Sequence, residues 1–324
     1  MKTSWLAELD GRRVTVEVPA TTANLGAGYD CLGMALELTN RVVLEVRGWS
    51  KGGPELEVTG EGAGELDAGP GNRFIQGLEA AITEARGSVP QGTTWGIEMT
   101  NKIPLARGLG SSAAATVAGL LAGNALLGDA LSGQDLLRLA AGIEGHPDNA
   151  APAMLGGFVA SAMVGDVVEA FRFDVPRGIR AVIFIPDLRL STADMRKVLP
   201  GRVPRADAIA NLGRVAVGVA AFANGRKDAI RLLTEDRLHE PYRASIYPQF
   251  PRLVAEARAA GALGACLSGA GSAVISFTDT IAGVGRIESA FRAAAADTDL
   301  QGRIDVIAPR NAGARIVPEP VAKA

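Results

Sequence analysis

The sequence has little of what several common protein classes need. It contains only two cysteines in 324 residues, Cys31 and Cys266, which are too few and too isolated for a disulfide framework or a cysteine-rich metal cluster. Its 33 basic and 35 acidic residues nearly cancel, so the net charge gives no electrostatic footprint for nucleic acid or an anionic membrane. Both cysteines are expected to be ordinary packed side chains, and any bound anion must be held by local groups.

Signals for export or membrane insertion are also weak. Residues 1–13 carry five charged side chains and lack the apolar core of a signal peptide. Residues 108–128 contain no charge and are long enough to cross a bilayer, but their glycines, serines and Asn124 lower the hydrophobicity. A helix buried in a soluble core explains the same residues, so we expect a cytoplasmic protein that binds neither membrane nor nucleic acid.

Hydrophobic periodicity divides the chain into two halves that each mix helices and strands. In the first half, strands are expected over 14–18, 41–46 and 95–103, and helices over 72–86, 111–127 and 134–144. In the second half, strands are expected over 158–163, 170–175, 181–186, 304–308 and 314–317 and on both sides of 269–271, and helices over 194–260 and 280–296. This is an α+β pattern. We place the boundary at residue 170, giving domains 1–170 and 171–324 that share an extensive interface.

A glycine and serine loop, Gly108-Leu109-Gly110-Ser111-Ser112, runs directly into the small-residue helix expected over 111–127. Glycines let the backbone approach a ligand closely, and the first amides of the helix point outward at the positive end of its dipole. The chain has no Gly-Lys dipeptide, which excludes a Walker A loop, and no glycine trio with dinucleotide spacing. The loop is a candidate cradle for a triphosphate, and the alternative is a tight turn with a serine cap.

Four segments together resemble the GHMP kinase superfamily, and within it the homoserine kinase family. They are residues 19–30, 104–115, 144–153 and 267–271, which occur in the family's order over nearly the whole chain. The resemblance implies a two-domain α+β fold, with a ribosomal-protein-S5-domain-2-like N-terminal domain that binds ATP and a ferredoxin-like C-terminal domain. It also implies transfer of the γ-phosphate of ATP to the side-chain hydroxyl of L-homoserine, a step of threonine biosynthesis.

On the nucleotide side, the resemblance assigns most contacts to the glycine loop. The residues that would bind ATP are Asn72, at the adenine, and Pro104, Gly108, Leu109, Gly110, Ser111, Ser112, Ala113, Gly269 and Gly271. Thr192 would lie near the γ-phosphate. The Ser112 hydroxyl and the Glu144 carboxylate are hard oxygen ligands, and two suffice for Mg²⁺ because this ion keeps waters and phosphate oxygens. The alternatives for this pair are a helix cap and a surface glutamate.

A small zwitterionic acceptor needs an anion for its ammonium group and cations for its carboxylate. By resemblance, Asp30 and Asn24 supply the first, and Arg196 and Arg243 supply the second, for which arginine suits bidentate binding. His146 and Asn149 complete the resemblance as substrate contacts. The alternative for each arginine is a surface ion pair.

The sequence leaves the mechanism open. Phosphoryl transfer depends mainly on alignment and charge neutralisation, so a strong base is not obligatory. The Asp148-Asn149 pair leaves ambiguous which residue matches the aspartate of related mevalonate kinases. We expect transition-state stabilisation by Mg²⁺ and the loop amides, with a catalytic set of Ser112, Glu144, Asp148, Asn149 and Thr192. In one departure, Ser272 follows the last motif where the family commonly has proline.

Two alternative functions are kept. The first is another GHMP enzyme such as mevalonate kinase or a diphosphomevalonate decarboxylase, but these usually carry a lysine in the first motif and none lies between Val14 and Asp30. The second is a noncatalytic nucleotide-binding protein on the same fold. Retention of Ser112, Glu144 and Asp148 argues against it, because a noncatalytic site would not need to keep its metal-binding groups. Composition does not give the oligomeric state, so a homodimer stays an open alternative.

Overall fold

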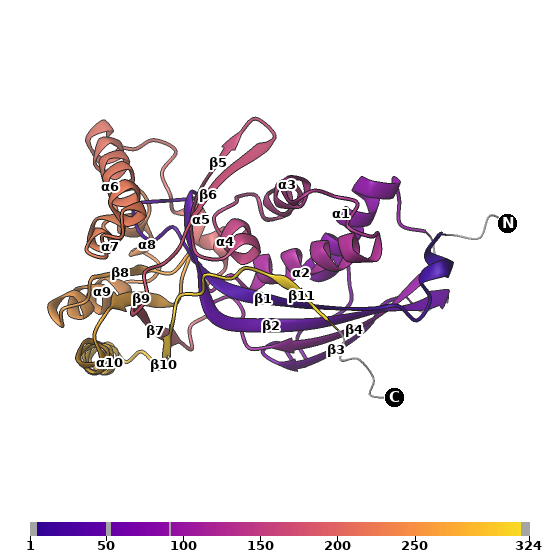
Figure 1. Cartoon of the computed structure of the whole chain (residues 1–324). Coiled ribbons are helices and arrows are strands. Elements are labelled where there is room, and N and C mark those ends of the chain that lie inside the picture. The colour runs from indigo at the N-terminus through magenta and orange to yellow at the C-terminus, as the bar shows by residue number, and fades with distance from the viewer. Residues whose placement is uncertain (1–4, 50–52, 91, 319–324) are drawn as a thin grey trace.

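Two β-sheets, each covered by helices, make up the computed structural model, which describes residues 5–49, 53–90 and 92–318 (Figure 1). The first sheet has the strand order β11-β1-β2-β4-β3, with β5 joined to β2 and β6 joined to β5. The second sheet has the order β10-β7-β9-β8. This arrangement confirms the predicted two-domain α+β fold.

The first sheet is built from the first half of the chain. Its elements are η1 (Trp5–Leu9), β1 (Arg13–Ala23), β2 (Leu32–Trp49), β3 (Glu55–Gly60), α1 (Arg73–Arg86), β4 (Thr93–Asn101), α2 (Ser111–Leu126), α3 (Gly133–Glu144), α4 (Ala150–Leu155), β5 (Phe158–Val164) and β6 (Val167–Phe173). Helices α1 to α4 lie together on one face of the sheet, with α2 packed on β1 (Figure 1). Neither β3, whose partner β4 runs parallel to it, nor α4 was expected from the sequence.

The second sheet has the chain order β-α-β-β-α-β typical of a ferredoxin-like domain. Its elements are β7 (Arg180–Pro186), α5 (Thr192–Lys197), α6 (Arg205–Ala223), α7 (Ala229–Leu233), α8 (Glu240–Arg243), α9 (Phe250–Ala259), β8 (Gly264–Leu267), β9 (Val274–Thr278), α10 (Ile281–Asp297) and β10 (Gly302–Ile307). The stretch expected to be helical over 194–260 is divided into five separate helices. Pro204, Pro241 and Pro251 each lie at the start of one of them, where a missing N–H costs nothing.

One hydrophobic core joins the two halves. Alternate residues of β7 point to opposite faces of the second sheet, as the period of two in a strand requires. Ile183 and Ile185 pack in the core that also holds β1, β2 and α2, whereas Val182 and Phe184 pack with α9 and α10. The expected extensive interface between the halves is therefore present.

The end of the chain returns to the first sheet. Strand β11 (Arg315–Val317) pairs antiparallel with β1. Residue 170 falls inside β6, which still belongs to the first sheet, and the second sheet begins with β7 at Arg180. The division into 1–170 and 171–324 remains a prediction, to which the structure adds that β11 lies apart from the sheet of its own half.

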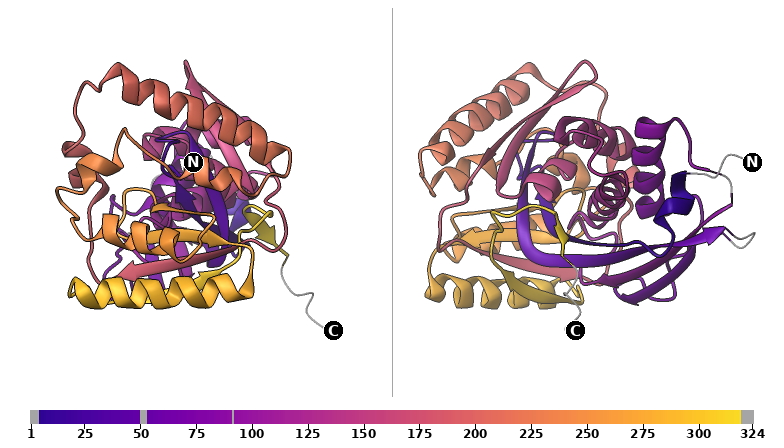
Figure 2. Two further views of the ribbon diagram at one scale, coloured as in Figure 1. Left: turned by 90° about the vertical axis from the view of Figure 1, so that its left-hand side faces the viewer. Right: turned by 45° about the vertical axis from the view of Figure 1, so that its right-hand side comes forward.

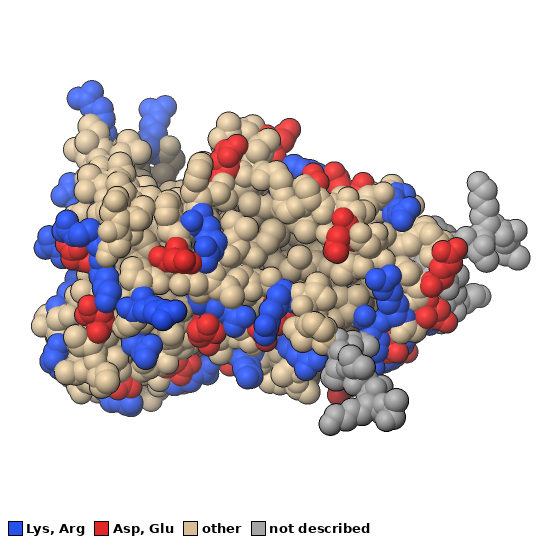
Figure 3. Space-filling model, viewed as in Figure 1, with Lys and Arg blue, Asp and Glu red and all other residues tan. Residues whose placement is uncertain are grey.

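Among the described residues, one helix, α6, is long and apolar enough by length and composition alone to cross a bilayer, which is weak evidence for a membrane span. It lies along the outside of the molecule (Figure 2). The side chains of Ile209, Leu212 and Val217 on this helix are exposed. The segment 108–128 behaves as expected, because its helix α2 is mostly buried. On the face drawn in Figure 3, basic and acidic side chains are interspersed.

Candidate functional site

The four motifs of the sequence meet at one cleft of about 190 Å³. The connections that form it are β1–β2 (residues 24–31), β4–α2 (residues 102–110), α3–α4 (residues 145–149) and β8–β9 (residues 268–273). Predicted site residues that line it are Asn24, Asp30, Pro104, Gly108, Leu109, Gly110, Ser111, Ser112, Ala113, Glu144, His146, Asp148, Asn149, Thr192, Arg196, Arg243 and Gly269. Of the predicted set, only Asn72 and Gly271 are not among its lining residues.

The glycine loop leaves the start of α2 without a side-chain cap. The N-cap residue is Gly110, in the left-handed conformation with φ of 73°, so the serine-cap alternative is wrong. The first α-type bond runs from the Ala114 amide to the Gly110 carbonyl, and the amides of residues 111–113 have no hydrogen-bond partner in the described part of the chain. A Cβ on Gly110 would lie 1.9 Å from the Thr21 Oγ1. These free amides at the positive end of a buried helix favour an anion.

The third motif packs directly against this loop. The Ser268 hydroxyl donates to the Gly108 carbonyl at 2.7 Å, and the Ala273 amide donates to the Arg107 carbonyl at 3.0 Å. A Cβ on Gly108 would lie 2.1 Å from the Ser268 carbonyl oxygen. Ser272, the departure from the family pattern, uses its hydroxyl to donate to the Leu188 carbonyl. The turn at 268–273 thus holds the loop from the side of the second sheet.

Ser112 and Glu144 lie together as a metal-binding pair requires. The Ser112 Oγ is 3.0 Å from the Glu144 Oε1. Adjacent ligands of an octahedral Mg²⁺ are about 2.9 Å apart, because each lies roughly 2.0–2.1 Å from the ion, so the pair fits this cation. The Glu144 side chain is only 8% exposed, which contradicts the surface-glutamate alternative.

Two neighbours of Glu144 were missed by sequence reasoning. The Thr116 hydroxyl donates to the Glu144 Oε1 at 2.7 Å, and the Arg73 Nε lies 3.9 Å from the same oxygen. Thr116 follows Ser112 by four residues on α2, so helical periodicity alone places both hydroxyls on one face. These contacts orient the carboxylate toward the start of α2.

An apolar pocket of about 370 Å³ adjoins the polar cleft and shares Ser111, Ser112 and Thr192 with it. Its larger apolar lining residues are Val42, Leu66, Met99 and Leu105, and its polar lining includes Asn40, Asn72 and Asn101. The Asn72 side chain also caps α1, because its Oδ1 accepts from the amides of Phe74 and Ile75. A flat ring with a polar edge suits such a lining.

At the other end of the cleft, Arg196 and Asp30 form a bidentate ion pair. The two guanidinium nitrogens lie 3.0 and 2.7 Å from the two carboxylate oxygens, and the Tyr29 hydroxyl accepts from Arg196 at 2.7 Å. Both side chains of the pair remain about one third exposed. The anion and the cation predicted to bind an acceptor are therefore paired with each other.

Arg243 is almost fully buried, so it is not the surface ion pair of the alternative reading. Its Nη1 donates to the Gly269 carbonyl at 2.8 Å, and burial lowers the pKa of its guanidinium. The Tyr29 ring, which sequence reasoning missed, faces the guanidinium groups of both Arg196 and Arg243 at 5.4 and 5.5 Å from its centre. One aromatic ring thus supports both predicted carboxylate ligands.

The remaining polar residues link the motifs to one another. The Asn24 side chain donates to the Gly269 carbonyl at 2.9 Å and accepts from the Asp30 amide at 3.0 Å. The Asn149 Oδ1 accepts from the Thr21 hydroxyl at 2.7 Å. The side chains of Asn24 and Asn149 therefore link neighbouring motifs as well as line the cleft.

His146 and Asp148 form a close pair beside Asp30. The Nδ1 of His146 contacts the Asp148 carboxylate, and one ligand-type atom from each of Asp30, His146 and Asp148 lies within 4.8 Å of the others. Burial acts to lower the pKa of His146, but the hydrogen bond and charge of Asp148 outweigh it and raise that pKa. The Asp148 carboxylate is thereby already engaged by a neighbouring side chain.

Comparison with known proteins identifies related sequences and folds. Residues 73–157 match the family model "GHMP kinases N terminal domain", and residues 219–297 match "GHMP kinases C terminal". Homoserine kinase of Moorella thermoacetica is 43% identical over 93% of this chain and 99% of its own length.

Two solved structures give the same picture at the level of the fold. The crystal structure of homoserine kinase from Cytophaga hutchinsonii superposes with a TM-score of 0.80 at 29% identity, covering 94% of this chain and 97% of its own. L. major mevalonate kinase in complex with R-mevalonate superposes at 0.67 with 14% identity, covering 90% and 95%, and shares the fold. The extent and level of identity to the curated relatives show that the chain belongs to the homoserine kinase family of the GHMP kinases.

Proposed function

We propose that the protein is an ATP-dependent kinase that transfers the γ-phosphate to the side-chain hydroxyl of L-homoserine, giving O-phospho-L-homoserine for threonine biosynthesis. The observation that carries the proposal is the position of the Asp30–Arg196 pair and Arg243 in the same cleft as the uncapped start of α2. The 43% identity to a curated homoserine kinase supports it. We also propose that the enzyme works in the cytoplasm, where both substrates would be at hand.

The acceptor end suits a molecule with one positive and one negative group. A zwitterion can insert between Asp30 and Arg196, replacing their ion pair with two new ones, so that neither side chain is left unpaired. A molecule with a single charge would leave one of the two partners without a counter-charge, which costs affinity. This argues for an amino acid over mevalonate, which has a carboxylate and no ammonium group.

The donor end suits the phosphates of a nucleotide. The amides of residues 111–113 would donate to phosphate oxygens, and the adjoining apolar pocket would take the base. Ser112 and Glu144 would hold Mg²⁺, which supplies charge neutralisation on the phosphates when bound. Thr116 and Arg73 would keep the Glu144 carboxylate aimed at that position.

For the chemical step, we propose alignment and charge stabilisation rather than strong base catalysis. Asp148 is 2% exposed and bonded to His146, so its carboxylate serves to fix the imidazole as well as to face the cleft. The loop amides and the dipole of α2 act where charge develops on the transferring group. Asn149 and Thr192 line the cleft between the two ends and would orient the acceptor hydroxyl and the γ-phosphate.

The test is ADP release with Mg·ATP and a panel of L-homoserine, L-serine, L-threonine, mevalonate and shikimate. We expect L-homoserine to be the preferred acceptor. Turnover of mevalonate but not of L-homoserine would overturn the substrate, and no turnover of any acceptor beside normal ATP binding would favour a noncatalytic nucleotide-binding protein.

We further propose that the protein is a homodimer that associates through α6. Ile209, Leu212 and Val217 on this helix are 60%, 69% and 58% exposed, and its one charged residue between Asp207 and Arg226 is Arg214, which is paired with Glu235. A face without charge needs no complementary charges on its partner, so a second copy offers a match. The exposed apolar side chains from Ile209 to Val217 extend over about 12 Å of the helix.

Light scattering after size-exclusion chromatography tests this association. The wild type is expected at twice the chain mass and Leu212→Glu at the chain mass, with unchanged turnover per chain. A wild type that runs at the chain mass would refute the dimer, and binding to neutral phospholipid vesicles instead would assign the α6 face to a membrane.

A further inference from the structure

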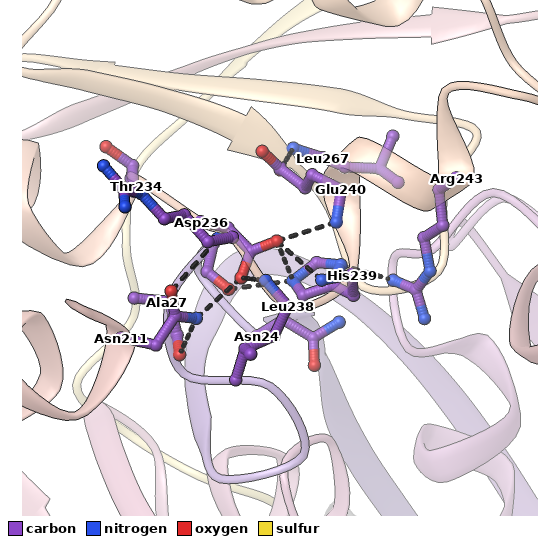
Figure 4. Close-up of polar contacts among 12 residues, drawn as sticks. Asn24, Ala27, Asn211, Thr234, Asp236, Leu238, His239, Glu240, Arg243 and Leu267 are labelled. Atoms are coloured by element: carbon purple, nitrogen blue, oxygen red, sulfur yellow. Dashed lines mark hydrogen bonds and ion pairs between the residues drawn. The ribbon is translucent and has the colours of Figure 1, made fainter. Parts of the chain in front are cut away.

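A buried turn behind the cleft connects the two ends of the acceptor site (Figure 4). At its centre His239 is fully buried, and each of its ring nitrogens has a partner. Its Nε2 lies 2.8 Å from the Gly26 carbonyl, and its Nδ1 lies 3.0 Å from the Nη1 of Arg243. Gly26 belongs to the loop that carries Asp30, so this imidazole spans from the first motif to Arg243.

The partners define the form of the imidazole. A guanidinium can only donate, so the Nδ1 of His239 accepts, and a carbonyl can only accept, so the Nε2 carries the proton. The ring is therefore neutral. Burial lowers the pKa of His239 to about 4, against the opposing effect of Asp236, which lies 3.8 Å from the Nε2. Arg243, Asp30 and Tyr29 are the other titratable or charged groups near it.

Asp236 fixes the turn in which His239 lies. Its carboxylate accepts from the backbone amides of Leu238, His239 and Glu240 at 2.9, 2.8 and 2.7 Å, and from the Asn211 side chain at 2.7 Å. Figure 4 shows these bonds converging on the one carboxylate. A buried acceptor with four donors holds the backbone in a single arrangement.

These contacts occupy part of the Arg243 guanidinium and leave one of its nitrogens able to donate to a ligand. The Nη1 of Arg243 donates to His239 and to the Gly269 carbonyl, and its Nε donates to the Met195 carbonyl at 3.4 Å, whereas the Nη2 makes no hydrogen bond to any described residue. Arg243 nevertheless lines the cleft. Contacts on the side away from the cleft thus fix the orientation of the guanidinium, and its Nη2 is left to donate to a ligand.

We propose that His239 is a positioning residue for carboxylate recognition, which holds the Arg243 guanidinium at a fixed place relative to residues 24–30. It thereby sets the separation between the carboxylate-binding and ammonium-binding groups of the acceptor site. The inference rests on the proposed function, and it makes His239 act through Arg243 without touching the acceptor.

The test compares His239→Phe, which keeps the ring volume but removes both nitrogens, with His239→Gln, which keeps an acceptor for Arg243. Affinities are measured for L-homoserine and for 3-aminopropan-1-ol, the same amino alcohol without its carboxylate, by calorimetry or competitive inhibition. Losing a hydrogen bond to a charged group should weaken L-homoserine binding by roughly 10- to 100-fold in His239→Phe. The affinity for 3-aminopropan-1-ol and the KM for ATP should change less than twofold.

His239→Gln should recover most of the L-homoserine affinity. Tyr247→Phe is the matched control, because it removes a buried hydroxyl that has no hydrogen-bond partner among the described residues, one helical turn beyond Arg243. Equal losses for both ligands, or no loss for L-homoserine, would overturn the proposal. If His239→Phe does not fold, the affinities of His239→Gln for the same two ligands test the proposal. We then expect a smaller loss of affinity, for L-homoserine and not for 3-aminopropan-1-ol. Wild-type turnover tests the proposed function separately.

Discussion

Replacement of Gly108 by alanine should separate the glycine loop from the turn that covers it. Alanine at a φ of 74° costs about 1–2 kcal/mol in backbone conformation. Its Cβ would lie 2.1 Å from the Ser268 carbonyl oxygen, so that backbone must move by about 1 Å to reach an ordinary contact of roughly 3.2 Å. The movement breaks the bond from the Ser268 hydroxyl to the Gly108 carbonyl, worth about 1 kcal/mol.

The sum is a loss of about 2–3 kcal/mol in the free energy of unfolding, with a raised KM for ATP because the loop amides are displaced. Urea unfolding and steady-state kinetics measure the two effects. Gly142→Ala is the control, because Gly142 lies in α3 with open space around its Cβ position, so alanine should stabilise by up to about 1 kcal/mol. Wild-type stability and wild-type KM in Gly108→Ala would refute the packing argument.

Three changes in the cleft and one in the buried turn behind it give further predictions. Glu144→Gln should raise the Mg²⁺ concentration for half-maximal rate at least about tenfold, because it removes a charged ligand, whereas Glu84→Gln should not. Asp148→Asn should keep turnover within about threefold of wild type; a loss of about a thousandfold would point to base catalysis. Arg196→Met should raise the KM for L-homoserine about 10- to 100-fold and leave the KM for ATP unchanged. Arg196→Lys should lower the KM for L-homoserine only part of the way back to the wild-type value, because lysine cannot make the bidentate contact. Burial raises the pKa of Glu240 to about 8 from an ordinary 4.5. The contribution of this shift to the free energy of unfolding is therefore complete below pH 4.5 and is lost as the pH rises to 8. In thermal melting, the Tm of Glu240→Gln relative to that of the wild type should therefore be higher at pH 9 than at pH 5. An equal difference in Tm at both pH values would contradict this.

Sequence reasoning located the site because its backbone requirements are local. Gly108 and Gly110 both adopt positive φ, and their Cβ positions are filled by neighbours, so the chain has to carry glycine there. The acidic and basic residues that face the cleft were found through the family resemblance, and their roles as ligands remain proposals.

Residues that act from a distance along the chain left no such signal. Tyr29 and His239 meet in space across more than 200 positions, at 5.2 Å between ring centres, and nothing in the local pattern of either predicts it. Thr116 could have been found from its helical spacing to Ser112. The strand β3 was overlooked although Glu55, Leu56, Glu57 and Val58 alternate between polar and apolar and between exposed and half-buried positions. The breaks within the helical stretch 194–260 were not predicted because prolines that start helices were not counted as breaks.

Strand β11 connects the second half of the chain to the first sheet. It follows β10 of the second sheet in the chain, yet it hydrogen-bonds along the outer edge of β1 in the first. Shortening the protein by its last ten to fifteen residues would strip that edge and offer it to other chains, which favours aggregation. A fusion partner or affinity tag at this end should therefore be joined through a spacer that leaves residues 315–317 free to dock.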